Sequence, residues 1–218
     1  AVLRMENPVQ KYSADIDSYY EFTSLLTAIT LTLGEGYAIH KQDVFVRKRF
    51  EDGTNERHEF LSAAYFRYFN GRRYTDSTCY LTVTQEARKS GLFSFDGKKW
   101  RDFLVKIRKV HDLLHDAGIQ AEFLGKSQAK EFVDRYFAMN FRDRIVSMTN
   151  FKVDDETVSM GGKRCKVYSL VDVDCVSLPS LVRPYTNIEV NNTEMPVDLL
   201  SVIDSIPEAE TVVYNQVI

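Results

Sequence analysis

The chain has 218 residues, with 28 Lys and Arg against 31 Asp and Glu, and 44% of its residues are hydrophobic. These values are ordinary for a globular protein and exclude a disordered or collagen-like chain. No run of about 18 apolar residues occurs, so the sequence predicts no transmembrane helix.

The charge is distributed unevenly along the chain. Residues 170–218 hold eight carboxylates and one arginine, a net charge of −7, whereas residues 1–169 have a net charge of +4. A protein that binds nucleic acid over its whole surface would be more uniformly basic. The acidic end is rich in Val, Leu and Ile, so we expect a structured surface near a domain boundary or a partner.

The first half of the sequence predicts two helices and two strands. Apolar residues at helical spacing indicate helices over 15–33 and 58–69, which end at Gly34-Glu35-Gly36 and Asn70-Gly71. A strand pattern over 37–47 places Lys41 and Asp43 on the same face as Ile39. A run of β-branched and aromatic residues over 78–84 indicates a second strand.

The second half begins with the most regular helix pattern, over 98–117, where an apolar stripe ends before the helix-stop residue Gly118. A strand over 119–124 and a helix over 127–139 follow. We then expect a hairpin of 158–160 and 164–171 around Gly161-Gly162, a short helix over 195–206 with Pro196 in its first turn, and a closing strand over 211–218. This order predicts an α+β fold, with a largely antiparallel sheet packed with amphipathic helices.

The cysteines and the chain ends bear on the class of protein. Cys79, Cys165 and Cys175 are widely spaced and odd in number, which is not typical of a disulfide framework or a zinc motif. The sequence begins without Met and ends inside a predicted strand. We therefore expect residues 1–218 to be part of a longer protein, with a candidate sub-boundary near residues 145–170.

His111 and His115 have the spacing of two metal ligands on a helix, with Asp112 and Asp116 beside them. A third ligand is not evident, and the helical projection puts His111 inside the apolar stripe. We interpret His111 as a histidine at the edge of the core and predict no metal site.

Other candidates for catalysis are incomplete. His40 and Asp43 could form part of a nucleophilic site, but on a strand they face opposite sides. The acidic pairs Asp154-Asp155 and Asp172/Asp174 are typical of solvated turns and strand ends. We predict no catalytic residue.

Two glycine motifs fall short of a phosphate-binding pattern. Gly161-Gly162-Lys163-Arg164 lacks the first glycine and the hydroxyl residue of a P-loop, and Gly34-Glu35-Gly36 lacks the third glycine of a dinucleotide motif. We predict no bound cofactor.

Basic residues cover the outer face of the 98–117 helix, with smaller clusters at 47–49 and 72–73; those on the helix are Lys98, Lys99, Arg101, Lys106, Arg108 and Lys109. Such a face can contact phosphate backbones, but it is more typical of the solvated side of an amphipathic helix or of a contact with an acidic partner or membrane. Binding of single-stranded DNA stays an alternative that we disfavour.

Three segments follow one another in order along the chain: His40-Lys41-Gln42-Asp43-Val44-Phe45, the stretch from Arg67 to Tyr74, and Cys79-Tyr80-Leu81-Thr82-Val83-Thr84. Together they resemble the N-terminal region of TraG-type ATPases of bacterial conjugative transposons. Weaker matches follow in the same order at 170–181, at 195–200 and at Tyr214-Asn215-Gln216. The chain departs from the family pattern at Tyr68 and Gly71, as a divergent member would.

The resemblance implies an N-terminal docking domain of a type IV secretion ATPase, whose RecA-like motor and P-loop would lie beyond Ile218. No catalytic residue of that family has a counterpart here, so the resemblance implies a chain that is not an enzyme by itself. Its implied partners are membrane components of the conjugation channel and the motor domain of the same protein, at the cytoplasmic face of the inner membrane. Self-association is a further implied contact.

Two alternatives to the docking role stay open. One is the single-stranded DNA-binding module already named. The other is a small standalone enzyme with His/Cys chemistry, which a pocket joining His40 or His111 to Cys79 would favour.

Overall fold

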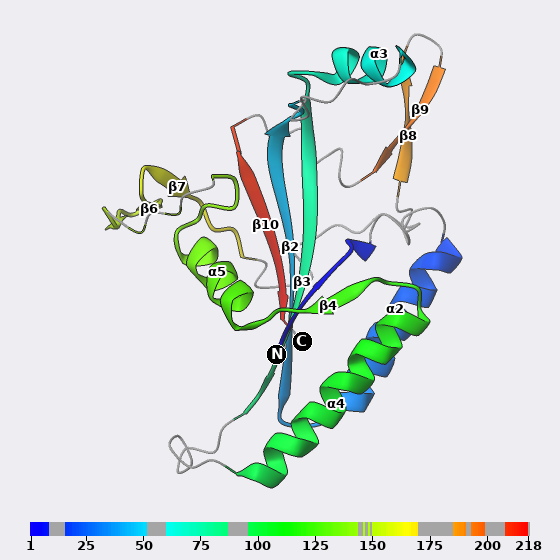
Figure 1. The fold of residues 1–218 in the computed structure, drawn as a ribbon, viewed down its shortest axis with the longest axis vertical. Coiled ribbons are helices and arrows are strands. Elements are labelled where there is room, and N and C mark those ends of the chain that lie inside the picture. Colours follow the sequence, from blue (N-terminus) through cyan, green and yellow to red (C-terminus); the bar gives the residue numbers. More distant parts are fainter. Residues whose placement is uncertain are drawn as a thin grey trace.

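The computed structural model describes residues 1–8, 16–51, 60–86, 96–143, 146, 148, 150–169, 185–190, 193–198 and 208–217. This part of the chain is an α+β fold, as the sequence predicts (Figure 1). Its helices are α2 (Ile16–Leu33), α3 (Phe60–Phe69), α4 (Gly97–Asp116) and α5 (Lys126–Phe137).

The main sheet has five strands in the order β10-β2-β3-β1-β4, and every neighbouring pair is antiparallel. The strands are β1 (Val2–Met5), β2 (Tyr37–Arg49), β3 (Arg73–Gln85), β4 (Ala121–Phe123) and β10 (Thr211–Val217). β2 and β3 pair over their full 13 residues, and α3 lies in the connection between them. The N-terminal and C-terminal strands are thereby held on opposite sides of one central β2–β3 pair.

Two smaller sheets complete the described structure. One contains β5 (Lys152–Val153), β6 (Val158–Met160) and β7 (Lys163–Cys165), and the other pairs β8 (Tyr185–Val190) with β9 (Thr193–Asp198). The turn between β6 and β7 consists of Gly161 and Gly162, with φ angles of 55° and 83°. Glycine adopts such positive φ angles without a steric cost, so the predicted hairpin is confirmed.

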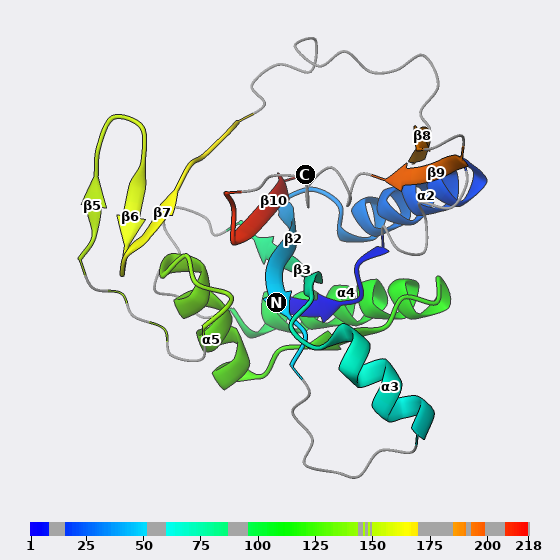
Figure 2. The same ribbon diagram turned by 90° about the horizontal axis from the view of Figure 1, so that it is seen from above.

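The hydrophobic core lies between one face of the main sheet and helices α2 and α4, which Figure 2 shows together on one side of the sheet. The residues that fill it alternate along the strands and recur at helical spacing, as one-sided burial requires. They include Leu3, Met5, Ile39, Cys79, Leu81 and Val83 from the sheet, and Leu25, Ile29, Leu33, Phe103, Ile107, Val110 and Leu114 from the helices.

The opposite face of the sheet carries α5. Phe132 of α5 packs against Tyr80 of β3, with 4.3 Å between the ring centroids. Tyr80 alternates with Cys79 and Leu81 along the strand, so its side chain projects from the face that α2 and α4 leave open. The sheet is therefore covered on both sides.

The expected helix over 195–206 is wrong where the structure describes it. Residues 193–198 form strand β9, in which Pro196 is opposite Asn187 of β8, and residues 199–207 lie outside the described part. A two-stranded sheet has only edge strands, and proline is tolerated there because its missing N–H can face away from the partner. Hairpin pairing with β8 thus overrides the helix-start signal of Pro196.

The remaining predicted elements are found with shifted ends, while β1, β5 and β8 were not foreseen. β3 is longer than the predicted 78–84 strand because its pairing with β2 continues to Arg73. Asp96 caps α4 by accepting hydrogen bonds from the backbone N–H groups of Lys98 and Lys99. Among the described residues, no helix has the length and apolarity to cross a bilayer.

Candidate functional site

The histidine pair on α4 does not form a metal centre within the described structure. His111 is half-buried: its Nε2 lies 3.1 Å from the carbonyl oxygen of Ala121, and its ring stacks on Phe123. His115 is exposed. No group of three or more His, Cys, Asp or Glu in the described part is placed to hold a metal ion. His111 thus occupies the core-edge position that its sequence pattern indicates.

His40 and Asp43 lie on opposite faces of β2, as the strand periodicity predicts. His40 Nε2 is 3.1 Å from Asn215 Oδ1, and Gln42 donates to the same oxygen at 3.0 Å. Asp43 instead lies on the face shared with Cys79, its register partner on β3. His40 is therefore separated from Cys79 by the sheet, and the two do not form a nucleophile–base pair.

The most unusual feature of the sheet face that carries Cys79 is a buried ion pair between Lys41 and Asp43. Their side chains are only 6% and 4% exposed, and Lys41 Nζ donates to Asp43 Oδ2. The other oxygen, Asp43 Oδ1, is buried and has no hydrogen-bond partner among the described residues. Removing the two charges from water costs free energy, and their mutual attraction offsets that cost. Each charge therefore depends on the other to remain buried.

Cys79 lies beside this pair and is completely buried. Burial, followed by the nearby negative charge of Asp43, raises the pKa of the Cys79 thiol far above its usual range. The thiol is consequently protonated at neutral pH, and a protonated thiol is a poor nucleophile and metal ligand. The geometry assigns Cys79, Lys41 and Asp43 to the interior of the sheet packing.

The burial of this pair was missed in the sequence. The alternation that places Lys41 and Asp43 with Ile39 was visible, and charged residues at two alternate positions of an apolar strand were the available signal. The neighbours of the pair on that face include Leu81 and Cys79 of β3, which come from a distant part of the chain.

The candidate turn residues have structural roles. The Thr157 hydroxyl donates to the Asp154 carboxylate, and the backbone N–H groups of Glu156 and Thr157 donate to Asp154 Oδ1; these hydrogen bonds lower the pKa of the exposed Asp154 carboxyl. This is an Asx-type turn leading into β6. Asp172 and Asp174 lie outside the described residues, as does Cys175.

A shallow depression of about 470 Å³ lies beside the basic face of α4, lined by residues that include Glu35, Tyr37, Lys99 and Lys109. Lys106 donates to the carbonyl oxygen of Leu33, and its Nζ lies 4.4 Å from the centre of the Tyr37 ring. Desolvation and then the charge of Asp102 raise the pKa of Tyr37. Lys106 thus joins α4 to the end of α2, so part of the basic face serves the fold.

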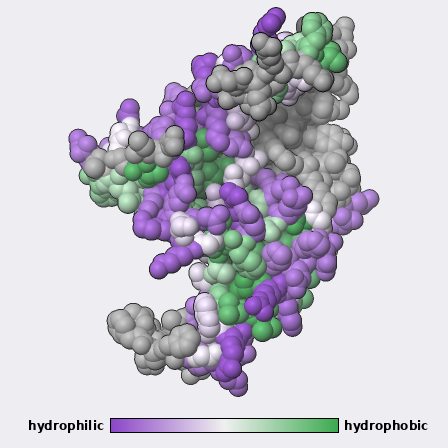
Figure 3. Space-filling view, in the orientation of Figure 1, coloured by the Kyte–Doolittle hydropathy of each residue, from purple (hydrophilic) through white to green (hydrophobic). Residues whose placement is uncertain are grey.

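α3 carries the largest exposed group of aromatic residues in the described structure. Phe66 and Phe69 pack against Phe50, with ring centroids 5.8 and 6.4 Å apart. The other large side chains, Phe60, Leu61, Tyr65 and Tyr68, are exposed, and no residue of α3 is buried. Figure 3 shows hydrophobic atoms over this end of the molecule beside hydrophilic ones. A group of exposed apolar side chains on one helix is typical of a contact site.

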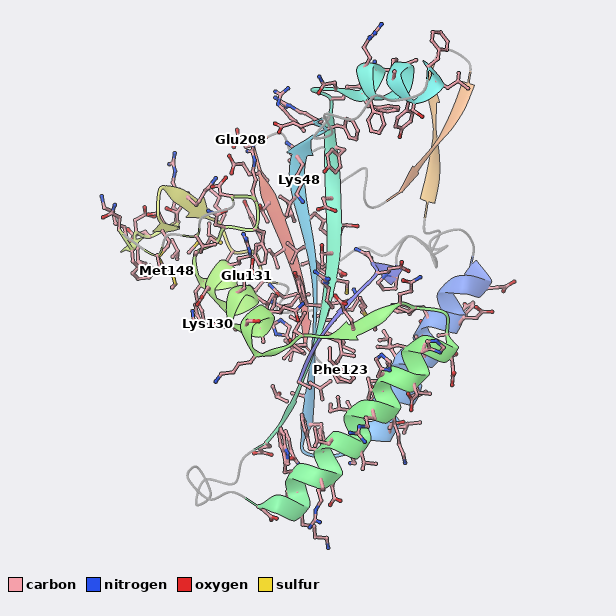
Figure 4. All side chains as sticks on the ribbon, viewed as in Figure 1. Lys48, Phe123, Lys130, Glu131, Met148 and Glu208 are labelled. Atoms are coloured by element: carbon pink, nitrogen blue, oxygen red, sulfur yellow. The ribbon has the colours of Figure 1, made fainter. Side chains whose placement is uncertain are left out.

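The acidic end of the chain is partly used within the fold. Glu208 lies just before β10, at the end where the strand begins (Figure 4). Glu210 contacts Arg142 at 3.2 Å and also forms an ion pair with Lys163 of β7. These contacts join β10 to the segment after α5. Glu210 therefore stabilises the packing of the closing strand rather than forming a free acidic surface.

Of the segments compared with the TraG-type family, those at 40–45, 79–84 and 214–216 lie on adjacent strands of the main sheet, whereas the described part of 195–200 lies in β9 and 170–181 lies outside the described residues. β10 pairs with β2 so that Tyr214 is opposite Asp43, Asn215 opposite Gln42 and Gln216 opposite Lys41. On the other side of β2, Asp43 is opposite Cys79 of β3. Segments separated by 175 residues in sequence, counted from His40 to Asn215, thus lie on adjacent strands.

No family model matches this chain, and neither a curated protein nor a solved structure matches it. Arguments about function therefore rest on the chain's own residues and on the resemblance of its short segments.

Proposed function

We propose that this chain is a non-catalytic docking and assembly domain of a conjugative DNA-transfer ATPase, with the motor following residue 218. Its partners are membrane components of the transfer channel and the motor itself. In this role it lies at the cytoplasmic face of the inner membrane and positions the motor against the channel.

The observation that carries the proposal is the convergence of the resembling segments in β10, β2 and β3. Three of the segments that resemble the family, 40–45, 79–84 and 214–216, keep its chain order and lie on adjacent strands of one sheet. Hydrogen bonds of His40 and Gln42 to Asn215 link the first segment to the last. The three segments thus form one continuous part of the sheet, which supports a shared scaffold.

A docking role also suits the combination of a well-packed sheet and the exposed helix α3. The Lys41–Asp43 pair is buried in the packing of the sheet, while α3 extends from the connection at one end of β2 and β3. A rigid platform with an exposed contact helix holds a partner in one orientation, because loss of flexibility on binding is then small.

The proposal predicts that the isolated chain competes with its parent protein for docking sites. Producing the 218-residue chain in about tenfold excess in donor cells should reduce conjugative transfer at least tenfold. A variant unfolded by the core substitution Leu81→Asp, produced at the same level, should leave transfer unchanged. Unchanged transfer in the presence of folded excess chain would contradict the proposal, as would ATP hydrolysis by the isolated chain.

A further inference from the structure

β10, the red strand in Figure 1, forms one edge of the main sheet, and within the described structure no strand lies beyond it. Its pairing with β2 is continuous over all seven residues, from Thr211 opposite Val46 to Val217 opposite His40. Residues 214–217 are exposed, and the exposed fractions of Tyr214 and Val217 are 48% and 71%. This half of the edge is therefore accessible to a further strand.

The hydrogen-bond pattern shows which residues of β10 point their backbone groups away from β2. The backbone N–H of Arg47 donates to the carbonyl oxygen of Glu210, its opposite residue when the register is continued by one position. Hydrogen-bonded and non-hydrogen-bonded residue pairs alternate along an antiparallel pair of strands. The even-numbered residues of β10 therefore bond to β2. The N–H and C=O groups of the odd-numbered residues point outward, and these residues are Thr211, Val213, Asn215 and Val217.

The two edges of the sheet differ in how they are protected from further pairing. Edge strands of natural proteins are commonly short, or carry charged residues, proline or a bulge. β4, the opposite edge, has only three residues and includes Glu122, which is paired with Arg4. β10, TVVYNQV, contains neither a charged residue nor proline, and its register with β2 has no bulge. β10 thus has the features of an edge that accepts another strand.

We propose that β10 pairs antiparallel with β10 of a second copy of this chain, which joins the two main sheets into one continuous sheet. In the register that places Tyr214 opposite Tyr214, every outward-facing residue has a partner: Thr211 is opposite Val217, and Val213 is opposite Asn215. Both strands present the same surface, so the contact has two-fold symmetry and closes at two copies. This contact goes beyond the proposed docking function and does not depend on it.

The side chains of β10 suit a second copy better than a charged partner. Two copies meet without like charges opposite each other, whereas a charged peptide finds no complementary charge on the strand. The two Tyr214 residues form a non-hydrogen-bonded pair, where side chains approach most closely and aromatic pairs stabilise a sheet. Glu210, directly before the strand, already pairs with Arg142 and Lys163. Antiparallel pairing also places the two copies of Glu210 at opposite ends of the contact.

The test is sedimentation velocity of the full 218-residue chain over a range of concentrations, in which we expect a monomer–dimer equilibrium. Val213→Pro should weaken dimerisation by about tenfold or more, because proline removes an outward-pointing N–H. The hydrogen bonds between β10 and β2 do not use that group, so circular dichroism should show a folded chain. Val167→Pro is the matched control, since Val167 is 77% exposed and lies outside β10, and it should dimerise like the wild type.

A charge exchange at Tyr214 tests both the partner and the register. Tyr214→Lys and Tyr214→Glu should each be monomeric, because like charges would be directly opposite, and an equimolar mixture of the two should dimerise. The proposal is overturned if the mixture of folded variants stays monomeric, or if Val213→Pro dimerises as tightly as the wild type. A wild-type chain that is monomeric at every concentration would also overturn it, while leaving the proposed function standing.

Discussion

Replacing Asp43 by valine should strongly destabilise the fold, because it leaves Lys41 charged and buried without its partner. Both side chains are almost fully enclosed, and Lys41 Nζ donates to Asp43 Oδ2. Removing one member of a buried ion pair typically costs about 3–5 kcal/mol. This is a large share of the total stability of a domain, which is about 5–15 kcal/mol. For a chain of this size the loss corresponds to a fall in Tm of about 10 °C.

Removing both charges should restore most of that loss. In the double variant Lys41→Met, Asp43→Val, no unpaired charge remains and the replacements have similar volumes. Replacing a buried pair by apolar residues is often neutral or stabilising. We therefore expect the double variant to lie within about 1 kcal/mol of the wild type, or above it. The two substitutions are then strongly non-additive, as expected for residues in contact.

Equilibrium unfolding in urea, followed by circular dichroism, gives the four free energies of this cycle. Lys130→Ala is the control, because Lys130 forms an exposed pair with Asp134 on α5 at 2.5 Å, and Lys130 itself is 76% exposed. Its loss should cost less than about 1 kcal/mol. The reasoning is refuted if Asp43→Val costs no more than Lys130→Ala, or if the two substitutions at 41 and 43 are additive.

Three further predictions concern single residues. At pH 7.5 a Cys175→Ser chain should be alkylated at Cys165 and not at Cys79 until urea is added, because burial raises the pKa of the Cys79 thiol; equal rates of alkylation at Cys79 and Cys165 would contradict this. Asp96→Ala should lower the Tm at pH 7, where the ionised carboxylate caps α4. Hydrogen bonds from Lys99 and Lys98 lower the pKa of Asp96, so its stabilisation is present above an unfolded pKa of about 4 and disappears as pH falls through the folded value. A Tm difference between Asp96→Ala and wild type that does not narrow at low pH would refute the cap. Leu114→Ala should cost about 2–5 kcal/mol in urea unfolding, since Leu114 is 2% exposed in the core; a loss below about 1 kcal/mol would place Leu114 outside it.

Elements defined by local periodicity could be predicted from the sequence. α4 has a continuous apolar stripe and a stop at Gly118, whose φ of 71° suits glycine, and it was placed to within one residue at each end. β2 and β10 were recognised because alternation and β-branched residues persist over several positions. Such signals depend on neighbours along the chain, so no tertiary knowledge is needed to interpret them.

Elements defined by distant pairing could not be predicted in the same way. β1 has only four residues, and its place between β3 and β4 depends on strands far along the chain. Pro196 indicated a helix start, whereas its pairing with β8 makes it part of an edge strand. In both cases the partner strand decides the structure, and the local sequence carries little of that information.

The residues of the candidate site also differ in whether their positions follow from local periodicity or from contacts with distant residues. The opposed faces of His40 and Asp43 followed from strand alternation, and the core-edge position of His111 followed from the helical projection. The burial of Lys41 and Asp43 depends on residues distant in the chain, among them Leu81 and Cys79 of β3. The exposure of α3 depends on how little of the described structure packs against it. An apolar 10-residue helix looks the same in sequence whether it is covered or not.

The docking role is tested most directly by affinity purification of the tagged chain from cells that also produce the membrane subunits of the transfer channel. The account predicts that at least one membrane subunit co-purifies with the folded chain in near-stoichiometric amount. The Leu81→Asp chain should retain none, because the scaffold that presents the contact surface is lost. A folded wild-type chain that retains no membrane subunit would contradict the proposed function.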